Sequence, residues 1–320
     1  MKYLATLLAT LLFLPLYGET PKPSCDFTPL FYGTFLELPT TNNDPGELTL
    51  QPYLYGGACF GVFDNNWNLQ SGGFGSLNPQ LLVYLGLTKH LQIFAEIGSQ
   101  TIWYHGHSSS DFSDSFLGLG WQFLWDQKGK ATPNLILNSV VLFPTGTYQR
   151  LGTKFNGFNA SGFGSYAAGL GLVIDKTFYS NPCHPLNLAL EFGYVYPFKT
   201  SLHGINTYGG AENTRGTYHL GGRAFVFLAA EYYINSSLTF SLDVQYQHGF
   251  TPTFTGFAGS YPTGEPALIL TKSDDELVVS PAIELGFTPQ MALYIGGFFT
   301  VAGRNVAAYA QGVLSFLISF

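Results

Sequence analysis

Charged side chains and long apolar runs are both scarce in this 320-residue sequence. Only 10% of the residues are charged although 46% are hydrophobic, whereas soluble globular domains carry about 25% charged residues. Beyond the N-terminus, polar residues and glycines interrupt every apolar stretch before it reaches the roughly 20 residues that a transmembrane helix needs. These two absences exclude an ordinary soluble protein and a helical membrane protein, and they favour a barrel whose strands face lipid.

Basic clusters and cysteine pairs are also missing. The net charge is -7 and the 13 Lys and Arg residues are scattered, so no nucleic-acid partner is expected. The three cysteines, Cys25, Cys59 and Cys183, are odd in number and lack metal-type spacing. We interpret them as incidental, although an oxidising compartment would allow one bridge. The sequence predicts no cofactor and no metal site.

The first 18 residues have the pattern of a signal peptide. Lys2 provides the positive charge, residues 4–16 form a short apolar segment, and Gly18 is a small residue suited to precede cleavage. Lipidation at Cys25 is not expected, because the preceding residues do not form a lipobox. Residues 19–46 lack periodicity, and we interpret them as a periplasmic lead-in or a plug. The predicted barrel spans residues 47–320.

Strict alternation of apolar and polar residues is the main structural signal. It is clearest in residues 238–247, 186–198, 91–98 and 276–287, where one set of side chains would face lipid and the other the lumen. Weaker runs lie near residues 47–60, 79–88, 112–125, 133–143, 162–175, 216–233, 290–302 and 306–320. Together they predict a single all-β, antiparallel up-and-down barrel of about twelve strands.

The links between these runs alternate in length, as expected for short periplasmic turns and longer extracellular loops. The longer links follow Gly56, Tyr104, Phe143, Lys199 and Phe250. The link after Phe250 is the longest, and it could form an external flap or fold into the lumen. Pro281 interrupts one strand and predicts a bulge or local break.

The chain ends on an amphipathic strand. Leu314, Phe316, Ile318 and Phe320 share one face. This ending resembles the C-terminal signal that bacterial outer-membrane proteins present to the barrel-assembly machinery. The strand must also pair with the first strand to remove the sheet edge.

Three short stretches carry a family resemblance. They are Tyr84-Leu-Gly-Leu-Thr-Lys-His-Leu91, then Ser113-Asp114 with Leu117-Gly118-Leu119, and Phe143-Pro-Thr-Gly-Thr147 followed by glycines between 162 and 171. Over residues 79–250 they resemble the "MetA-pathway of phenol degradation" family of outer-membrane channels. The resemblance implies passage of small aromatic or other hydrophobic molecules, and it brings no catalytic motif.

Ionisable residues at inward positions are the candidate lumen-lining and selectivity residues. By alternation they are Glu96, Glu191, Arg223, Asp243, Glu284 and His219. An ordinary register would place Arg223 between Glu191 and Asp243 at mid-height. Such an ion cluster could form a selectivity constriction or simply neutralise charge in a narrow barrel. Because carboxylates outnumber basic groups, an open lumen would favour cations.

The predicted function is passive uptake of small, hydrophobic or aromatic solutes across the outer membrane. The alternative is a structural or surface-interaction barrel without an open channel. An enzyme is not expected, because no His, Ser and carboxylate pattern is recognisable. His105 and His107 could bind a metal, but they fit a polar solvated loop better.

Overall fold

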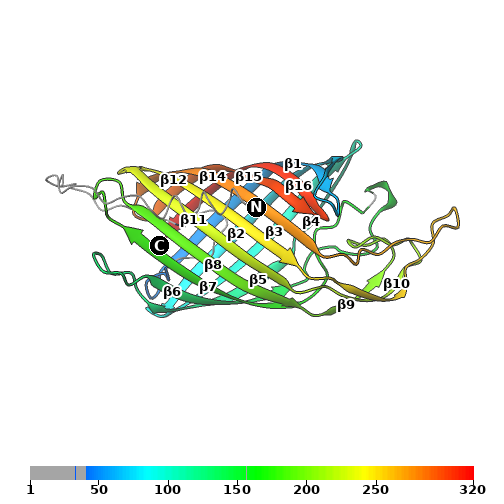
Figure 1. The fold of residues 1–320 in the computed structure, drawn as a ribbon, viewed down its shortest axis with the longest axis horizontal. Coiled ribbons are helices and arrows are strands. Elements are labelled where there is room, and N and C mark those ends of the chain that lie inside the picture. Colours follow the sequence, from blue (N-terminus) through cyan, green and yellow to red (C-terminus); the bar gives the residue numbers. More distant parts are fainter. Residues whose placement is uncertain (1–32, 34–40, 156) are drawn as a thin grey trace.

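The computed structural model describes residues 33, 41–155 and 157–320, and these form a closed antiparallel barrel of twelve strands (Figure 1). The wall consists of β1 (Leu48–Phe63), β2 (Leu69–Thr88), β3 (Leu91–Tyr104), β5 (Ser115–Leu124), β6 (Asn134–Phe143), β7 (Ala167–Phe178), β8 (Leu186–Pro197), β11 (Arg223–Asn235), β12 (Leu238–Gly249), β14 (Asp274–Thr288), β15 (Met291–Arg304) and β16 (Val306–Ser319). The predicted all-β fold and strand number are confirmed.

The wall closes in chain order. Each strand pairs with its neighbour along the sequence, and β16 returns to β1 through pairs such as Leu50 with Ile318. The ladder also includes Phe320, which exchanges backbone hydrogen bonds with Leu48 at 2.9 and 3.2 Å. Closure therefore leaves no free sheet edge in the wall.

The wall strands place most of their polar side chains in the interior and large apolar side chains on the outside. In β12, Thr239, Ser241 and Asp243 are almost fully buried, whereas Phe240 and Tyr246 are exposed on the other face. Large apolar side chains cover the outer surface in the same way around the barrel. This is the reverse of a water-soluble protein, and it is stable only where hydrocarbon surrounds the sheet.

The only regular helix in the described residues is the single-turn η1 (Thr153–Phe155). The described part of the chain contains no helix of the length and apolarity needed to cross a membrane.

The two ends of the barrel differ in their connections. At one end, called here the short-turn end, the links between strands are brief, as at residues 89–90 and 236–237. The opposite, long-loop end carries residues 144–166, 198–222 and 250–273. By the usual asymmetry of such barrels the long-loop end faces outward. The predicted alternation holds except after Gly56, because β1 continues to Phe63 and turns tightly into β2.

The long loops build structure of their own. A hairpin arm, β4 (His107–Phe112), pairs with β3 alone, and β9 (Lys199–His203), β10 (Arg215–His219) and β13 (Thr253–Phe257) form a separate three-stranded sheet. Strands β9 and β10 project beyond the barrel in Figure 1. The strand predicted over 216–233 is therefore two strands in two sheets. The link after Phe250 is external, because β13 belongs to this second sheet.

Pro281 interrupts the hydrogen-bonded ladder without breaking its strand. It pairs with Leu242 of β12, and on the other side the register continued from Ala282–Gly296 places it opposite Gly297. Proline has no N–H to donate to the ladder. The Ser280 hydroxyl donates to the Gly297 carbonyl oxygen at 2.6 Å instead. The predicted local break is thus limited to one lost backbone donor.

The predicted signal peptide, residues 1–18, lies outside the described residues, as does most of the predicted lead-in, residues 19–46. Both remain predictions. Of the three cysteines, Cys59 is buried and has a free thiol, whereas Cys183 is disulfide-bonded. The interpretation of the cysteines as incidental is therefore wrong for Cys183.

Candidate functional site: the lumen and its vestibule

Carboxylates line the interior of the barrel wall. Three predicted inward residues, Glu191, Asp243 and Glu284, are each 1% exposed, and Glu96 occupies an inward position of β3. Two further buried carboxylates, Glu231 in β11 and Asp175 in β7, were not predicted. Alternation within β11, continued from Phe225 and Phe227, places Glu231 on the inward face.

The predicted ion cluster of Glu191, Arg223 and Asp243 does not form. Arg223 is the first residue of β11 and pairs with Val195, whereas Glu191 pairs with Phe227. Four residues of extended strand, about 13 Å, therefore separate the two charges along the wall. Arg223 instead bonds to Asp274 at 2.8 Å and Gln247 at 3.3 Å near the long-loop end.

His219 is also not a residue of the barrel wall. It lies at the end of β10 in the outer sheet, opposite Lys199 and Thr253, and its ring meets Tyr196 edge to face at 5.9 Å. The alternation of side chains around residue 219 belongs to β10, a strand of the outer three-stranded sheet. The prediction that His219 lines the lumen wall is therefore wrong.

A vestibule lies at the long-loop end, and the Arg223–Asp274 pair forms part of its lining. Its cavity measures about 560 Å³, within the range typical of small-molecule sites. Most of its lining is apolar and comes from both the wall and the loops. The apolar and aromatic lining residues are Val62, Phe63, Leu142, Phe163, Ala167, Val195, Pro197, Tyr208, Tyr218, Leu220, Phe250, Pro252 and Leu270.

The roof of this vestibule is packed and hydrogen-bonded. Tyr208 and Tyr218 stack with ring centroids 4.0 Å apart, and Leu202 is fully buried beside them. The Tyr208 hydroxyl donates to the Phe163 carbonyl and the Tyr218 hydroxyl to the Leu270 carbonyl, both at 2.6 Å. Loops from three connections are tied together in this way, so the cavity is preformed.

Asp114 fastens the loop of residues 144–166 to the vestibule. Its carboxylate accepts the backbone N–H groups of Gly146 at 2.9 Å and Phe163 at 2.7 Å. Burial nevertheless raises the pKa of Asp114 above its usual range, against the opposite effect of these two donors. Two of the stretches that carry the family resemblance meet here, since Thr145 also bonds to the Ser113 carbonyl at 2.7 Å.

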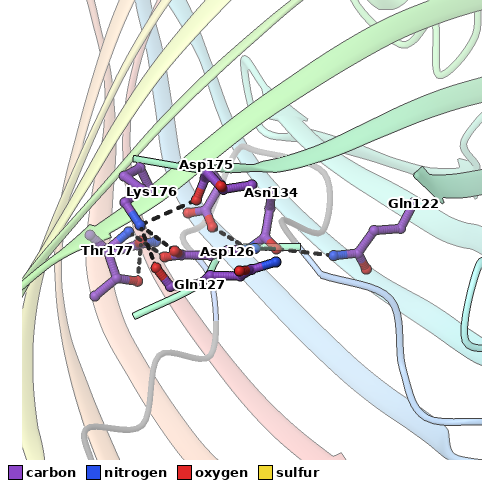
Figure 2. Close-up of polar contacts among 9 residues, drawn as sticks. Gln122, Asp126, Gln127, Asn134, Asp175, Lys176 and Thr177 are labelled. Atoms are coloured by element: carbon purple, nitrogen blue, oxygen red, sulfur yellow. Dashed lines mark hydrogen bonds and ion pairs between the residues drawn. The ribbon is translucent and has the colours of Figure 1, made fainter. Parts of the chain in front are cut away.

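A polar network lies at the short-turn end of the barrel (Figure 2). Asn134 donates to Asp175 at 2.7 Å and accepts from Gln122 at 3.1 Å. Lys176 forms an ion pair with Asp126, whose carboxylate also accepts the Thr177 N–H at 2.9 Å. Every partner in this network is polar, so this end of the barrel is more hydrophilic than the mostly apolar vestibule at the opposite end.

The short-turn end also receives the segment that precedes β1. The backbone N–H groups of Asn42 and Asn43 each donate at 2.9 Å, to Gln122 and Gln92 respectively. Nearer the N-terminus, the backbone N–H of Gly33 donates to the Glu231 carboxylate at 3.2 Å. Inward-facing side chains of the wall therefore hold described parts of this segment.

Aromatic side chains fill part of the interior between the two ends. Tyr53, Tyr84, Phe94 and Tyr294 are buried in one cluster, with Phe298 packed against it. Phe94 and Tyr294 are both fully buried. The middle of the lumen is consequently narrow and mixed in character, with carboxylates on one side and aromatic rings on another.

A closed antiparallel barrel with an apolar outer surface and a polar interior defines a β-barrel protein of the outer membrane, which is where this chain resides. No family model matches the chain, and no curated protein matches it. Its fold is similar to that of solved bacterial barrels.

The COG4313 outer membrane channel from Pseudomonas putida F1 superposes with a TM-score of 0.64 at 12% identity, covering 88% of this chain and 98% of that one. A NanC porin gives a TM-score of 0.44 at 11% identity over 84% of this chain and 98% of that one. A TodX monoaromatic hydrocarbon channel mutant gives 0.43 at 10% identity over 88% and 91%. At these identities the likeness concerns the fold.

Proposed function

We propose that the chain is a channel for passive uptake of small hydrophobic or aromatic solutes across the outer membrane. The apolar vestibule of about 560 Å³ at the long-loop end carries this proposal. A preformed apolar cavity above a polar lumen would concentrate such solutes at the outer side of the membrane. The resemblance to the MetA-pathway family, whose members are associated with phenol degradation, agrees with this solute class.

Passage would run from the vestibule, past the Arg223–Asp274 pair, into the carboxylate-lined interior. Residues 19–46 would enter the lumen from the short-turn end, a proposal supported by the hydrogen bonds that Gly33, Asn42 and Asn43 make to inward-facing side chains. The C-terminal strand ending at Phe320 would be recognised by the barrel-assembly machinery. No enzymatic step is proposed.

Uptake of a radiolabelled aromatic hydrocarbon by whole cells with an intact outer membrane tests the function. Cells that express the protein should take up the hydrocarbon several-fold faster than cells without it. Leu220→Asp places a charge in the vestibule and should abolish most of the gain. Phe112→Ser is the matched control, because this aromatic residue is 71% exposed on β4 and does not line the vestibule.

The second candidate is a structural or surface-interaction barrel without an open channel. The buried aromatic cluster of Tyr53, Tyr84, Phe94 and Tyr294 favours it, because it narrows the interior. Conductance in planar bilayers distinguishes the two. A folded barrel that is electrically silent and does not accelerate uptake would support the second candidate and contradict the first.

A further inference from the structure

Cys183 lies in the turn that joins β7 to β8 at the short-turn end, and this turn is held firmly. The backbone N–H of Cys183 donates to the Asn181 side chain at 3.1 Å. The ring Nδ1 of His184 lies 3.1 Å from the Tyr233 carbonyl oxygen, and the Tyr233 N–H donates to the Pro185 carbonyl oxygen at 3.1 Å. Cys183 is half-buried and disulfide-bonded, so its bond is attached to a fixed point on the rim of the barrel.

Cys59 is not the partner of Cys183. It has a free thiol, which is buried and donates to the Gly61 carbonyl oxygen at 3.2 Å. Cys59 also lies eleven residues beyond Leu48 along β1, which places it about 36 Å of extended strand away from the short-turn end. The two Cα atoms of a disulfide must approach within about 7 Å. Because the chain has three cysteines, only Cys25 remains as a partner within one molecule.

The described contact of Gly33 brings the N-terminal segment close to this turn. The Gly33 N–H donates to one carboxylate oxygen of Glu231 at 3.2 Å, and the Asn187 amide donates to the other at 3.0 Å. Asn187 follows Cys183 by four residues, at most about 14 Å of chain. Gly33 follows Cys25 by eight residues, which can span up to about 28 Å. Cys183 is therefore within reach of Cys25.

We propose that Cys25 and Cys183 form a disulfide that attaches the N-terminal segment to the turn between β7 and β8. Cys25 precedes the described residues and follows the predicted cleavage site at Gly18, so the mature chain keeps it. The new bond joins the two Sγ atoms, and each thiol gives up one proton and one electron. The two electrons reduce the disulfide of an exported thiol oxidoreductase to a dithiol. The periplasm is a compartment in which such bonds form and persist.

The bond would fix the N-terminal segment on the side of the barrel opposite its attachment to β1. β1 is the first strand of the wall, whereas β7 and β8 are the sixth and seventh of twelve. The turn that carries Cys183 therefore lies half-way around the ring from Leu48. Residues 26–47 would run from one side of the short-turn end to the other. This inference rests on the placement of residues 19–46 in the proposed function and adds a covalent attachment to it.

Peptide mapping by mass spectrometry tests the bond on the unaltered chain. The protein is extracted from outer membranes, its thiols are blocked with N-ethylmaleimide in denaturant, and it is digested without a reductant. The expected product is a peptide pair that joins Cys25 to Cys183 and separates on reduction, with Cys59 recovered as a blocked thiol. Cys183 joined to Cys59, to a second copy of the chain or to a small thiol would overturn the inference, as would a blocked Cys183.

Thiol counts in denaturant without a reductant give a second test. The unaltered chain should show one thiol. The variants Cys25→Ser and Cys183→Ser should each show two in the monomeric fraction, because each frees the partner of the residue removed. Cys59→Ser is the matched control and should show none. A count of one in Cys25→Ser would contradict the pairing, and mapping of the unaltered chain decides if that variant is not produced.

The uptake assay separates this inference from the proposed function. A barrel that contains the Cys25–Cys183 bond but takes up no hydrocarbon would contradict the proposed function alone. Uptake by a barrel in which mapping finds no such bond would contradict this inference alone.

Discussion

At the scale of single residues, the position of a charge along its strand determines what it can do. Arg223 and Glu191 both face inward, yet their separation along the wall gives Arg223 a partner near the long-loop end and leaves the middle of the lumen acidic. A second example is Pro281, which has no backbone N–H to donate. The hydroxyl of the preceding residue, Ser280, donates to the Gly297 carbonyl oxygen in its place. Ser280 thus supplies the hydrogen bond that the backbone ladder lacks at Pro281.

Ser280→Ala should lower the free energy of unfolding by about 1–2 kcal/mol, because it leaves the Gly297 carbonyl oxygen without its donor. In a Pro281→Ala background the new backbone N–H can supply the bond, so the cost should fall to half or less. Urea unfolding in lipid vesicles, followed by tryptophan fluorescence, measures both.

Ser315→Ala is the matched control for this cycle. Ser315 is an inward serine, 1% exposed, whose hydroxyl has no hydrogen-bond partner among the described residues. Its substitution should change stability little. Equal costs of Ser280→Ala in the two backgrounds would show that the hydroxyl does not replace the proline N–H.

At the scale of elements, the last strand closes the barrel. β16 pairs with both β15 and β1, so its loss would expose two edges at once. The outer sheet of β9, β10 and β13 has the opposite role, since it pairs with no strand of the wall and instead supplies the roof of the vestibule.

Deletion of Phe320 should reduce assembly in cells more than it reduces refolding in detergent. The residue adds one hydrogen-bonded pair with Leu48, a small part of the closure, but it would be the terminal aromatic group presented to the assembly machinery. Heat-modifiable mobility in gels measures the folded fraction in both settings. Phe320→Tyr keeps the aromatic ring and should assemble normally. Equal losses in cells and in detergent would mean that the residue acts only through closure.

At the scale of the whole molecule, the charges are segregated. The buried charged residues of the described chain are all acidic, whereas its Lys and Arg residues lie at the two ends. A lumen of this kind lowers the energy of a cation and raises that of an anion in its middle.

The reversal potential in a potassium chloride gradient across a planar bilayer should therefore show cation preference. Replacing both Glu231 and Glu284 by Gln should shift that potential toward zero, since two acidic groups of the lumen are removed. Higher ionic strength should weaken the preference, because salt screens the wall charges. A reversal potential that indicates anion preference would rule out the charge argument.

The sequence by itself determined the class of fold, the number of strands and the asymmetry of the two ends. Alternation is a local property, because each side chain must suit either lipid or lumen wherever its strand lies. Residues 238–247 and 186–198 therefore predicted β12 and β8 directly, and the inward positions of Glu191, Asp243 and Glu284 followed from the same pattern.

Only the tertiary structure decided which inward residues meet. The register between β8 and β11 separated Arg223 from Glu191, and the outer sheet took His219 from the wall. The vestibule depends on loops distant in sequence, tied by contacts such as Tyr208 to Phe163 and Tyr218 to Leu270. Strand pairing and loop packing are non-local, so a pattern that records only which face a residue occupies contains neither the pairing of strands nor the cavity between loops.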